Sequence, residues 1–222
     1  MNPRIISIDG PAASGKSSVA REIARRLGWI YVNTGNMYRA ATWAALRDAI
    51  DVSDEAQIAR AAASWDITCP VLNQCCAVRM DGRDIDSELN SENVNHAVSL
   101  VSRVPQVRDR LVSMQRAIGA AYPVVMEGRD IGTVVFPNAP VKFYIDASEE
   151  VRARRRGLQG QTDAIRWRDQ IDSTRKNAPL MAAKDAIIID SSDLSLDQVT
   201  ARVMKELQQR DIAPASETGH HP

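Results

Sequence analysis

The stretch Gly10-Pro11-Ala12-Ala13-Ser14-Gly15-Lys16-Ser17 decides the fold of this chain. It has the spacing G-x-x-x-x-G-K-S and comes directly after an apolar run over residues 5 to 8. In a loop of this kind, backbone N–H groups surround a polyphosphate, the lysine reaches the β and γ phosphates, and the last hydroxyl binds Mg²⁺. Val19, Ile23 and Leu27 then recur at helical spacing. The loop is therefore expected to join a buried strand to a helix whose N-terminus favours an anion.

The composition is that of one sizeable globular domain. The chain has 222 residues, of which 44% are hydrophobic, and its 28 basic residues balance its 28 acidic ones. A balanced charge gives no overall field that would attract nucleic acid or an anionic membrane. No apolar stretch approaches the roughly 20 residues needed to cross a bilayer, and residues 1 to 4 lead straight into the first strand. We expect a cytoplasmic protein without a signal peptide and without a nucleic-acid or membrane partner.

The cysteines do not form a recognisable metal or redox motif. Cys69, Cys75 and Cys76 are odd in number, and their spacing fits neither a zinc knuckle nor a C-x-x-C pair. We expect reduced thiols that are buried or half-buried.

Five short apolar runs alternate with helical patterns along most of the chain. They cover residues 5–8, 29–32, 123–127, 141–146 and 186–190. Runs of this length separated by helices predict a parallel sheet that is covered on both faces. Ligands of such sheets bind beyond the carboxyl ends of the strands, and the phosphate-binding loop follows one of these ends.

Several helix boundaries can be predicted from capping residues. A helix is expected over residues 37–46, after the turn 33–35. Ser53 is expected to cap a helix over residues 54–65. Residues 91–102 form a further predicted helix, and the next one is expected to begin at Pro105 and to end at Gly119.

A stretch near residues 66–90 interrupts this alternation. Residues 67–69, 76–80 and 83–86 have the pattern of small antiparallel strands, and Asp81-Gly82 is typical of a tight hairpin turn. We expect a small β-containing subdomain inserted into the parallel fold.

Four blocks together resemble the bacterial cytidylate kinase family. They are residues 9–17, residues 34–39 (T-G-N-M-Y-R), residues 127–137 (E-G-R-D-I-G-T-V-V-F-P), and residues 168–180 with the spacing R-D-x-x-D-x-x-R-x-x-x-P-L. The phosphate-binding loop is shared with many enzymes, whereas the third block is highly specific. The match extends, with gaps, from about residue 4 to residue 207.

The resemblance implies an α/β fold of the P-loop NTPase type in a single domain over residues 1–222. A five-stranded parallel sheet flanked by helices would form the core, over about residues 1–60 and 95–212. A nucleoside-monophosphate-binding insertion would span about residues 61–95, and a short helical lid about residues 152–175. The tail over residues 213–222 would be disordered. The family also implies a monomer.

The implied reaction is in-line transfer of the γ-phosphoryl group of ATP to CMP or dCMP, with Mg²⁺ as cofactor. Such a reaction depends on positioning and on neutralisation of charge, and the implied catalytic residues are Lys16, Arg129 and Arg175, with Ser17 as the Mg²⁺ ligand. A phosphate monoester has a second pKa of about 6 and is largely ionised at neutral pH, so that it needs no general base. An alcohol acceptor would need one, and no motif contains a histidine.

The resemblance also implies two sets of substrate contacts. Contacts to ATP are expected from Gly10, Pro11, Ala12, Ala13, Ser14, Gly15, Lys16, Ser17 and Ser18, and from the lid residues Arg152, Arg155 and Arg156, which share one helix face. Residues 190–192 are expected to form the loop beside the adenine. Contacts to CMP are expected from Thr34, Arg39, Ser99, Arg108, Arg129, Asp130, Arg168, Asp172 and Arg175.

The CMP contacts have distinct expected roles. Thr34, Arg39 and Arg129 would surround the acceptor phosphate, because guanidinium groups bind phosphate bidentately, and Arg175 would lie among the phosphates. Asp130 would accept a hydrogen bond from N4 of cytosine, and Arg108 and Ser99 would donate to its ring acceptors. UMP would be the poorer substrate, since uracil turns an acceptor toward Asp130. Arg168 and Asp172 would bind the ribose hydroxyls.

Two residues depart from the family pattern, and two alternatives stay open. Asn33 stands where the family has aspartate, and Asn36 where it has alanine. An amide can bind a metal-bound water but brings no charge. The first alternative is the same fold with UMP or a small alcohol as acceptor. The second is a nucleotide-binding regulator without turnover.

Overall fold

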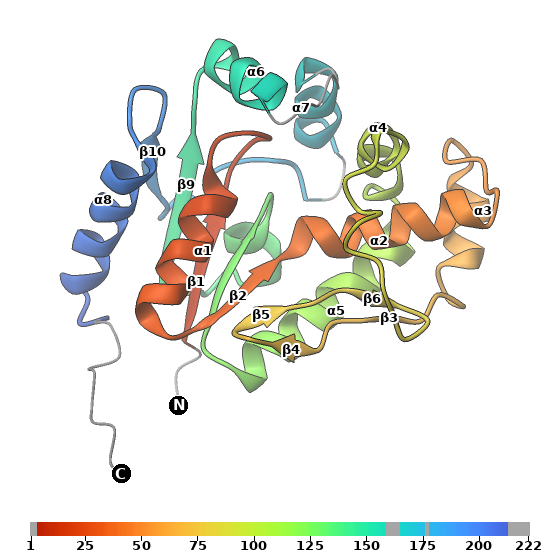
Figure 1. Ribbon diagram of the computed structural model, residues 1–222, viewed down its shortest axis with the longest axis horizontal. Helices are drawn as coiled ribbons and strands as arrows, with labels where there is room; N and C mark the ends of the chain where they lie inside the picture. The colour runs from red at the N-terminus through yellow and green to blue at the C-terminus, as the bar shows by residue number, and fades with distance from the viewer. Residues whose placement is uncertain (1–3, 159–164, 176–177, 213–222) are drawn as a thin grey trace.

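The structure, a computed structural model, describes residues 4–158, 165–175 and 178–212. It contains a seven-stranded sheet with the strand order β10-β9-β1-β8-β2-β5-β4. Five neighbouring strands are parallel, and they are the five predicted ones: β10 (Ile187–Asp190), β9 (Val141–Asp146), β1 (Ile5–Asp9), β8 (Val124–Gly128) and β2 (Ile30–Asn33). Their carboxyl ends point toward α6 (Glu149–Leu158) and α7 (Ile165–Ser173), at the top of Figure 1. The predicted fold class is confirmed.

Both faces of the parallel sheet are buried, because alternate strand residues point to opposite sides. Ile5 and Val124 pack into one core with α2 (Thr34–Arg47) and α5 (Pro105–Ala121). Ile6 and Val125, the next residue on each strand, pack into a second core with α1 (Lys16–Leu27) and α8 (Leu196–Gln208). None of these four strand residues is more than 1% exposed. This two-sided burial explains why the strands are continuous apolar runs.

The insertion contributes to two different sheets. The predicted strands over residues 67–69 and 83–86 are present in shorter form as β3 (Ile67–Thr68) and β7 (Arg83–Asp84). The predicted strand over residues 76–80 is divided, because only its end forms β6 (Arg79–Met80) and Cys76 belongs to the seven-stranded sheet. β3, β6 and β7 form a separate antiparallel sheet. Asp81 and Gly82 both have positive φ angles, of 51° and 74°, as a tight hairpin turn requires.

The remaining part of the insertion extends the main sheet, which was not predicted. β4 (Val71–Leu72) and β5 (Cys75–Cys76) form a hairpin that lies against β2 through the pair Tyr31 and Cys75. The N–H group of Tyr31 donates to the carbonyl oxygen of Gln74 over 2.8 Å. Without this hairpin, β2 would be an unpaired edge with open backbone groups. The need to pair that edge explains why the insertion is not one independent subdomain.

The three thiols are free and half-buried, as predicted. Burial raises the pKa of Cys69 to about 12 and that of Cys76 to about 11. These two thiols are therefore neutral at physiological pH.

The boundaries of α3 (Glu55–Ala61) differ from the prediction at both ends. Asp54, and not Ser53, is the N-cap, since its Oδ1 accepts from the N–H group of Gln57 over 2.9 Å. The Ser53 hydroxyl instead donates to Asp51. The helix ends before Trp65, whose indole is buried and donates to Asp48. The predicted helix over residues 91–102 is α4 (Glu92–Val101).

The prediction that Gly119 ends a helix is wrong. α5 begins at Pro105 as expected, continues through Gly119 and ends at Ala121. A Cβ atom at Gly119 would lie 2.6 Å from Cζ of Phe136, well inside van der Waals contact. Glycine is therefore needed here for close packing and not for termination.

Among the described helices, α5 included, none combines the length and the apolarity that crossing a membrane requires.

A buried carboxylate ends the central strand. Asp9, the last residue of β1, is 4% exposed and accepts hydrogen bonds of 2.8 Å from the N–H groups of Ile131 and Gly132. These residues begin η1 (Ile131–Val135), a single π-helical turn. Burial, and to a smaller extent the charge of Asp130, raise the pKa of Asp9 to about 7 against the opposing effects of the two N–H groups and Lys16.

Replacing Gly119 by alanine is expected to lower the free energy of unfolding by about 1–3 kcal/mol, because the added methyl group overpacks the site against Phe136. Urea unfolding measures the change. Gly157→Ala is the matched control, since Gly157 also lies in a helix and a Cβ atom there would meet no atom within 4 Å. Equal effects of the two substitutions would contradict the packing role of Gly119.

The raised pKa of Asp9 predicts a pH-dependent contribution to stability. Between about pH 4 and pH 7 the folded chain holds a proton on Asp9 that the unfolded chain releases, so the contribution of this group falls as the pH rises. The amide of the Asp9→Asn variant does not titrate. The difference in unfolding free energy between the wild type and Asp9→Asn should therefore decrease by more than about 1 kcal/mol from about pH 5 to pH 8. Urea unfolding at several pH values measures this, and a constant difference would refute it.

Candidate functional site

A cavity of about 580 Å³ lies at the carboxyl ends of β1, β2 and β8. Its walls come from the phosphate-binding loop, the first turns of α1 and α2, the end of β8, and residues of α4, α6 and the segment over residues 172–175. The position is the one expected for ligands of a parallel sheet. The lining residues include members of all four sequence blocks, so the fold brings these blocks together.

The phosphate-binding loop has the conformation that its glycines allow. Gly10 has no room for a side chain, because a Cβ atom would lie 2.0 Å from the carbonyl oxygen of Ile145. Gly15 has a φ of 89° and caps α1, the helix that begins at Lys16. The Lys16 amino group donates to the carbonyl oxygen of Pro11 over 3.0 Å. The loop residues that line the cavity are Ala12, Ala13, Gly15, Lys16, Ser17 and Ser18.

A carboxylate lies next to the expected metal ligand. The Ser17 hydroxyl donates to Oε1 of Glu127 over 2.8 Å, and the Tyr31 hydroxyl lies 3.3 Å from the same oxygen. Glu127 is 2% exposed and lines the cavity. It was not among the predicted site residues, although a carboxylate at the carboxyl end of the predicted strand over residues 123–127 was a usable signal. Hydroxyl and carboxylate oxygens are ligands that suit Mg²⁺.

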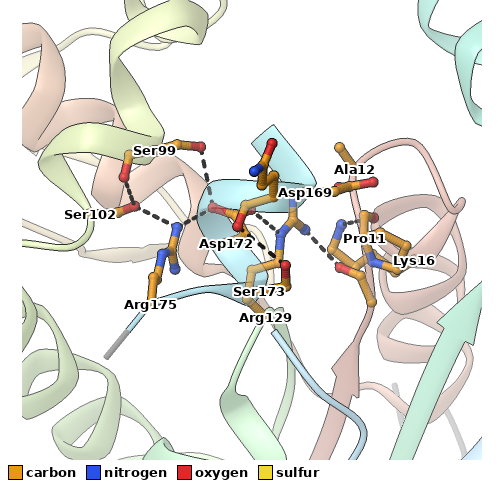
Figure 2. A network of polar contacts seen from close by, with 12 residues as sticks. Pro11, Ala12, Lys16, Ser99, Ser102, Arg129, Asp169, Asp172, Ser173 and Arg175 are labelled. Atoms are coloured by element: carbon orange, nitrogen blue, oxygen red, sulfur yellow. Dashed lines mark hydrogen bonds and ion pairs between the residues drawn. The ribbon is translucent and has the colours of Figure 1, made fainter. Parts of the chain in front are cut away.

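Asp172 is the centre of a polar network (Figure 2). Its carboxylate accepts from Nε of Arg129 over 2.9 Å and from the Ser99 hydroxyl over 3.2 Å, and it forms an ion pair with Arg175. Arg175 also donates to the Ser102 hydroxyl over 2.7 Å. The second contact of Arg129 is to the phosphate-binding loop, where it donates to the carbonyl oxygen of Gly10 over 2.8 Å.

Asp130 and Arg108 form a buried ion pair, and each side chain is about 6% exposed or less. Asp130 lines the cavity, whereas Arg108 is not among the lining residues. The Arg108 guanidinium lies 5.6 Å from the ring centre of Tyr38. The structure therefore places Arg108 behind Asp130, and not directly at the cavity as expected from the sequence.

The start of α2 forms another wall. Thr34 and Arg39 line the cavity as predicted, and the Thr34 hydroxyl donates to the carbonyl oxygen of Glu127 over 2.8 Å. A Cβ atom at Gly35 would lie 2.8 Å from an Arg39 guanidinium nitrogen, so glycine leaves room for this arginine. Asn33 caps the helix, which begins at Thr34 and thus earlier than predicted.

The three arginines expected to form the lid have different surroundings. Arg156 lines the cavity and donates to Oδ1 of Asn95 over 3.2 Å. Arg155 donates to the carbonyl oxygen of Ser191 over 2.7 Å, and the Ser191 hydroxyl donates to the carbonyl oxygen of Ser14. Arg152 forms an ion pair with Asp169. Only Arg156 of the three is a lining residue, and the side chain of Arg168 lies outside the described residues.

The insertion also reaches the cavity. Asp86 and Asn90, which follow β7, are lining residues that were not predicted. No local motif marks them, because their place in the wall depends on how the insertion packs on the core.

Known proteins match this sequence over nearly the whole chain. The family model described as cytidylate kinase matches residues 6–209. The chain is similar to a cytidylate kinase of Mycobacterium leprae (strain Br4923), with 45% identity over 96% of this chain and 99% of the relative. A cytidylate kinase of Geobacillus sp. (strain WCH70) is 44% identical over 92% of this chain and 96% of the relative.

A solved structure supports the fold alone. An uncharacterized protein from Eubacterium ventriosum ATCC 27560 covers 93% of this chain and 99% of its own length, with 14% identity and a TM-score of 0.50. The family assignment depends on the sequence matches and on the residues that the cavity brings together. On these grounds the chain belongs to the cytidylate kinase family.

Proposed function

We propose that this enzyme transfers the γ-phosphoryl group of ATP to CMP and dCMP. The observation that carries the proposal is the link from Arg129 to Gly10, which brings the phosphate-binding loop and the Arg129–Asp130 turn to one cavity. The relatives named cytidylate kinase support the acceptor. A cavity that holds both elements can bring a donor and an acceptor phosphate together, and such positioning is the main requirement of phosphoryl transfer.

On the donor side, the backbone N–H groups of the phosphate-binding loop and Lys16 would bind the ATP phosphates. Arg156 would add positive charge from α6, since it lines the same cavity. Arg155 would hold the loop after β10 against the phosphate-binding loop, because Ser191 contacts both Arg155 and Ser14. Arg152 would fix α6 to α7 through its ion pair with Asp169.

The residues present also fit the Mg²⁺ that the family implies. Ser17 and Glu127 would hold it, because their oxygens lie 2.8 Å apart at the cavity wall and are hard donors. The bound ion would neutralise charge on the transferring phosphates. Asn33, which stands where the family has aspartate, carries no charge. Glu127 would still give the Mg²⁺ an anionic ligand.

On the acceptor side, Asp130 would accept from N4 of cytosine, and Ser99 would donate to a ring acceptor. Arg108 would hold the Asp130 carboxylate in place through their ion pair, which replaces its expected direct contact with the base. The acceptor phosphate would be bound by Thr34, Arg39, Arg129 and Arg175. Asp172 would contact the ribose, together with Arg168.

The chemistry of the cavity favours a phosphate over an alcohol as acceptor. Its lining residues include Arg39, Arg129, Arg156 and Arg175. A phosphate monoester brings its own ionised oxygen and needs cations for binding. The arginine-rich wall therefore suits a nucleoside monophosphate.

The first test compares CMP, dCMP, UMP and AMP in a coupled assay of ADP formation, with millimolar Mg²⁺. CMP and dCMP should be phosphorylated fastest. Lys16→Ala should lower kcat by about 100-fold or more, because a charged donor to the transferring phosphate is lost. Lys205→Ala, which changes an exposed lysine of α8, is the control. The proposal fails if CMP does not accelerate ADP formation by the wild type.

The second test concerns base selection. Asp130→Ala should lower the ratio of kcat/KM for CMP to that for UMP by about tenfold or more, because it removes the acceptor for N4 and leaves Arg108 buried without its partner. Asp109→Ala, an exposed carboxylate on the same helix as Arg108, should keep the wild-type ratio. An unchanged ratio in Asp130→Ala would exclude Asp130 from base recognition.

A further inference from the structure

One buried carboxylate lies beneath the cavity without lining it. Asp9 ends β1 and directly precedes Gly10 of the phosphate-binding loop. In the sheet it lies between Gly128 of β8 and Tyr144 of β9. It is only 4% exposed and is not one of the residues that line the cavity. Asp9 can therefore act on the site only through the residues that it holds in place. None of the substrate contacts proposed above uses it.

Asp9 accepts hydrogen bonds from two N–H groups of η1 that have no acceptor within η1 itself. The first N–H groups of a helical turn have no partner inside that turn. In η1, the later N–H groups of Val134 and Val135 donate to the carbonyl oxygen of Asp130. The N–H groups of Ile131 and Gly132 donate instead to the two oxygens of Asp9, one to each, over 2.8 Å. The carboxylate therefore caps η1 from the neighbouring strand.

This cap holds the residues that come just before it. Asp130 is the N-cap residue of η1, and Arg129 precedes it. Arg129 donates to the carbonyl oxygen of Gly10, the residue after Asp9. The turn over residues 129–132 is thus attached to the end of β1 at three points, two through the Asp9 side chain and one through Gly10. Its outward side chains, Arg129 and Asp130, line the cavity.

We propose that Asp9 is a positioning residue for the acceptor nucleotide. By binding the N–H groups of Ile131 and Gly132, it fixes the turn in the orientation that presents Arg129 to the phosphate and Asp130 to the base. The role depends on the proposed function, since it assigns Asp9 to the acceptor half of that site.

The proposed role uses both oxygens of Asp9 as hydrogen-bond acceptors. The charged and titratable groups around Asp9 are Lys16 of α1, Asp130 of the turn and Tyr144 of β9. The Asp9→Asn variant would keep one carbonyl oxygen and turn an NH₂ group toward the other N–H group. The Asp9→Ala variant would leave both N–H groups buried without an acceptor. The two substitutions should therefore have graded effects.

The experiment compares Asp9→Asn and Asp9→Ala with the wild type. Steady-state assays give KM for CMP, kcat and the ratio of kcat/KM for CMP to that for UMP. Calorimetry gives the affinity for a non-hydrolysable ATP analogue with Mg²⁺. Asp9→Ala should raise KM for CMP by about tenfold and lower the CMP/UMP ratio by about threefold or more, and Asp9→Asn should show a smaller change in both. The affinity for the ATP analogue should stay within about threefold in both variants.

Ser7→Ala is the matched control. Ser7 lies on the same strand, two residues before Asp9, and is fully buried. A Cβ atom at Gly132 would lie 2.9 Å from its hydroxyl oxygen, so it packs against the same turn. That hydroxyl has no hydrogen-bond partner within the described part of the chain. Ser7→Ala should keep the wild-type KM and ratio.

The outcomes separate the possible errors. Wild-type KM for CMP and wild-type selectivity in both Asp9 variants would overturn the role of Asp9. Equal losses of CMP and ATP-analogue affinity would also overturn it, because they indicate general disruption. If Asp9→Ala does not fold, the nearly isosteric Asp9→Asn decides. A wild-type enzyme that does not phosphorylate CMP would contradict the proposed function itself.

Discussion

The hydrogen bond from Arg129 to the carbonyl oxygen of Gly10 joins the two halves of the site. One partner belongs to the phosphate-binding loop and the other to the turn after β8. The same arginine extends the connection to the lid region, since its Nε contacts Asp172. A guanidinium can make these contacts at once because its donors point in several fixed directions. Arg129 therefore fixes the phosphate-binding loop, the turn after β8 and Asp172 relative to one another.

Buried arginines around this contact have carboxylate partners. Arg108 is paired with Asp130, and Arg129 and Arg175 share Asp172. Burial of a charge without a partner is costly, so Asp172 allows Arg129 and Arg175 to lie at the cavity wall. The chain can thus concentrate positive charge where phosphates would bind while its overall charge stays at zero.

The sequence was sufficient for the features that depend on local chemistry. The five parallel strands follow from apolar runs, and the phosphate-binding loop follows from glycine, lysine and serine at fixed spacing. Glycine itself was ambiguous, since Gly15 serves the loop conformation and Gly119 serves packing against Phe136. Only the tertiary structure distinguishes the two uses.

The features that could not be predicted depend on contacts between distant segments. The β4–β5 hairpin pairs with β2 because that strand would otherwise have an open edge. Arg108 lies behind Asp130, and Asp86 enters the wall, through the packing of α5 and the insertion. Glu127 was missed although it ends a predicted strand, because its contact with Ser17 joins residues 110 positions apart.

The placement of the β4–β5 hairpin has a consequence for self-association. The seven-stranded sheet ends on one side in β4, which has two residues, and on the other in β10, which has four. A β-sheet that continues from one molecule to the next needs two long exposed edge strands on every molecule. In the described part of this chain, β4 is too short to serve as such an edge of the seven-stranded sheet. Head-to-tail polymerisation through this sheet therefore lacks the second edge strand that it needs.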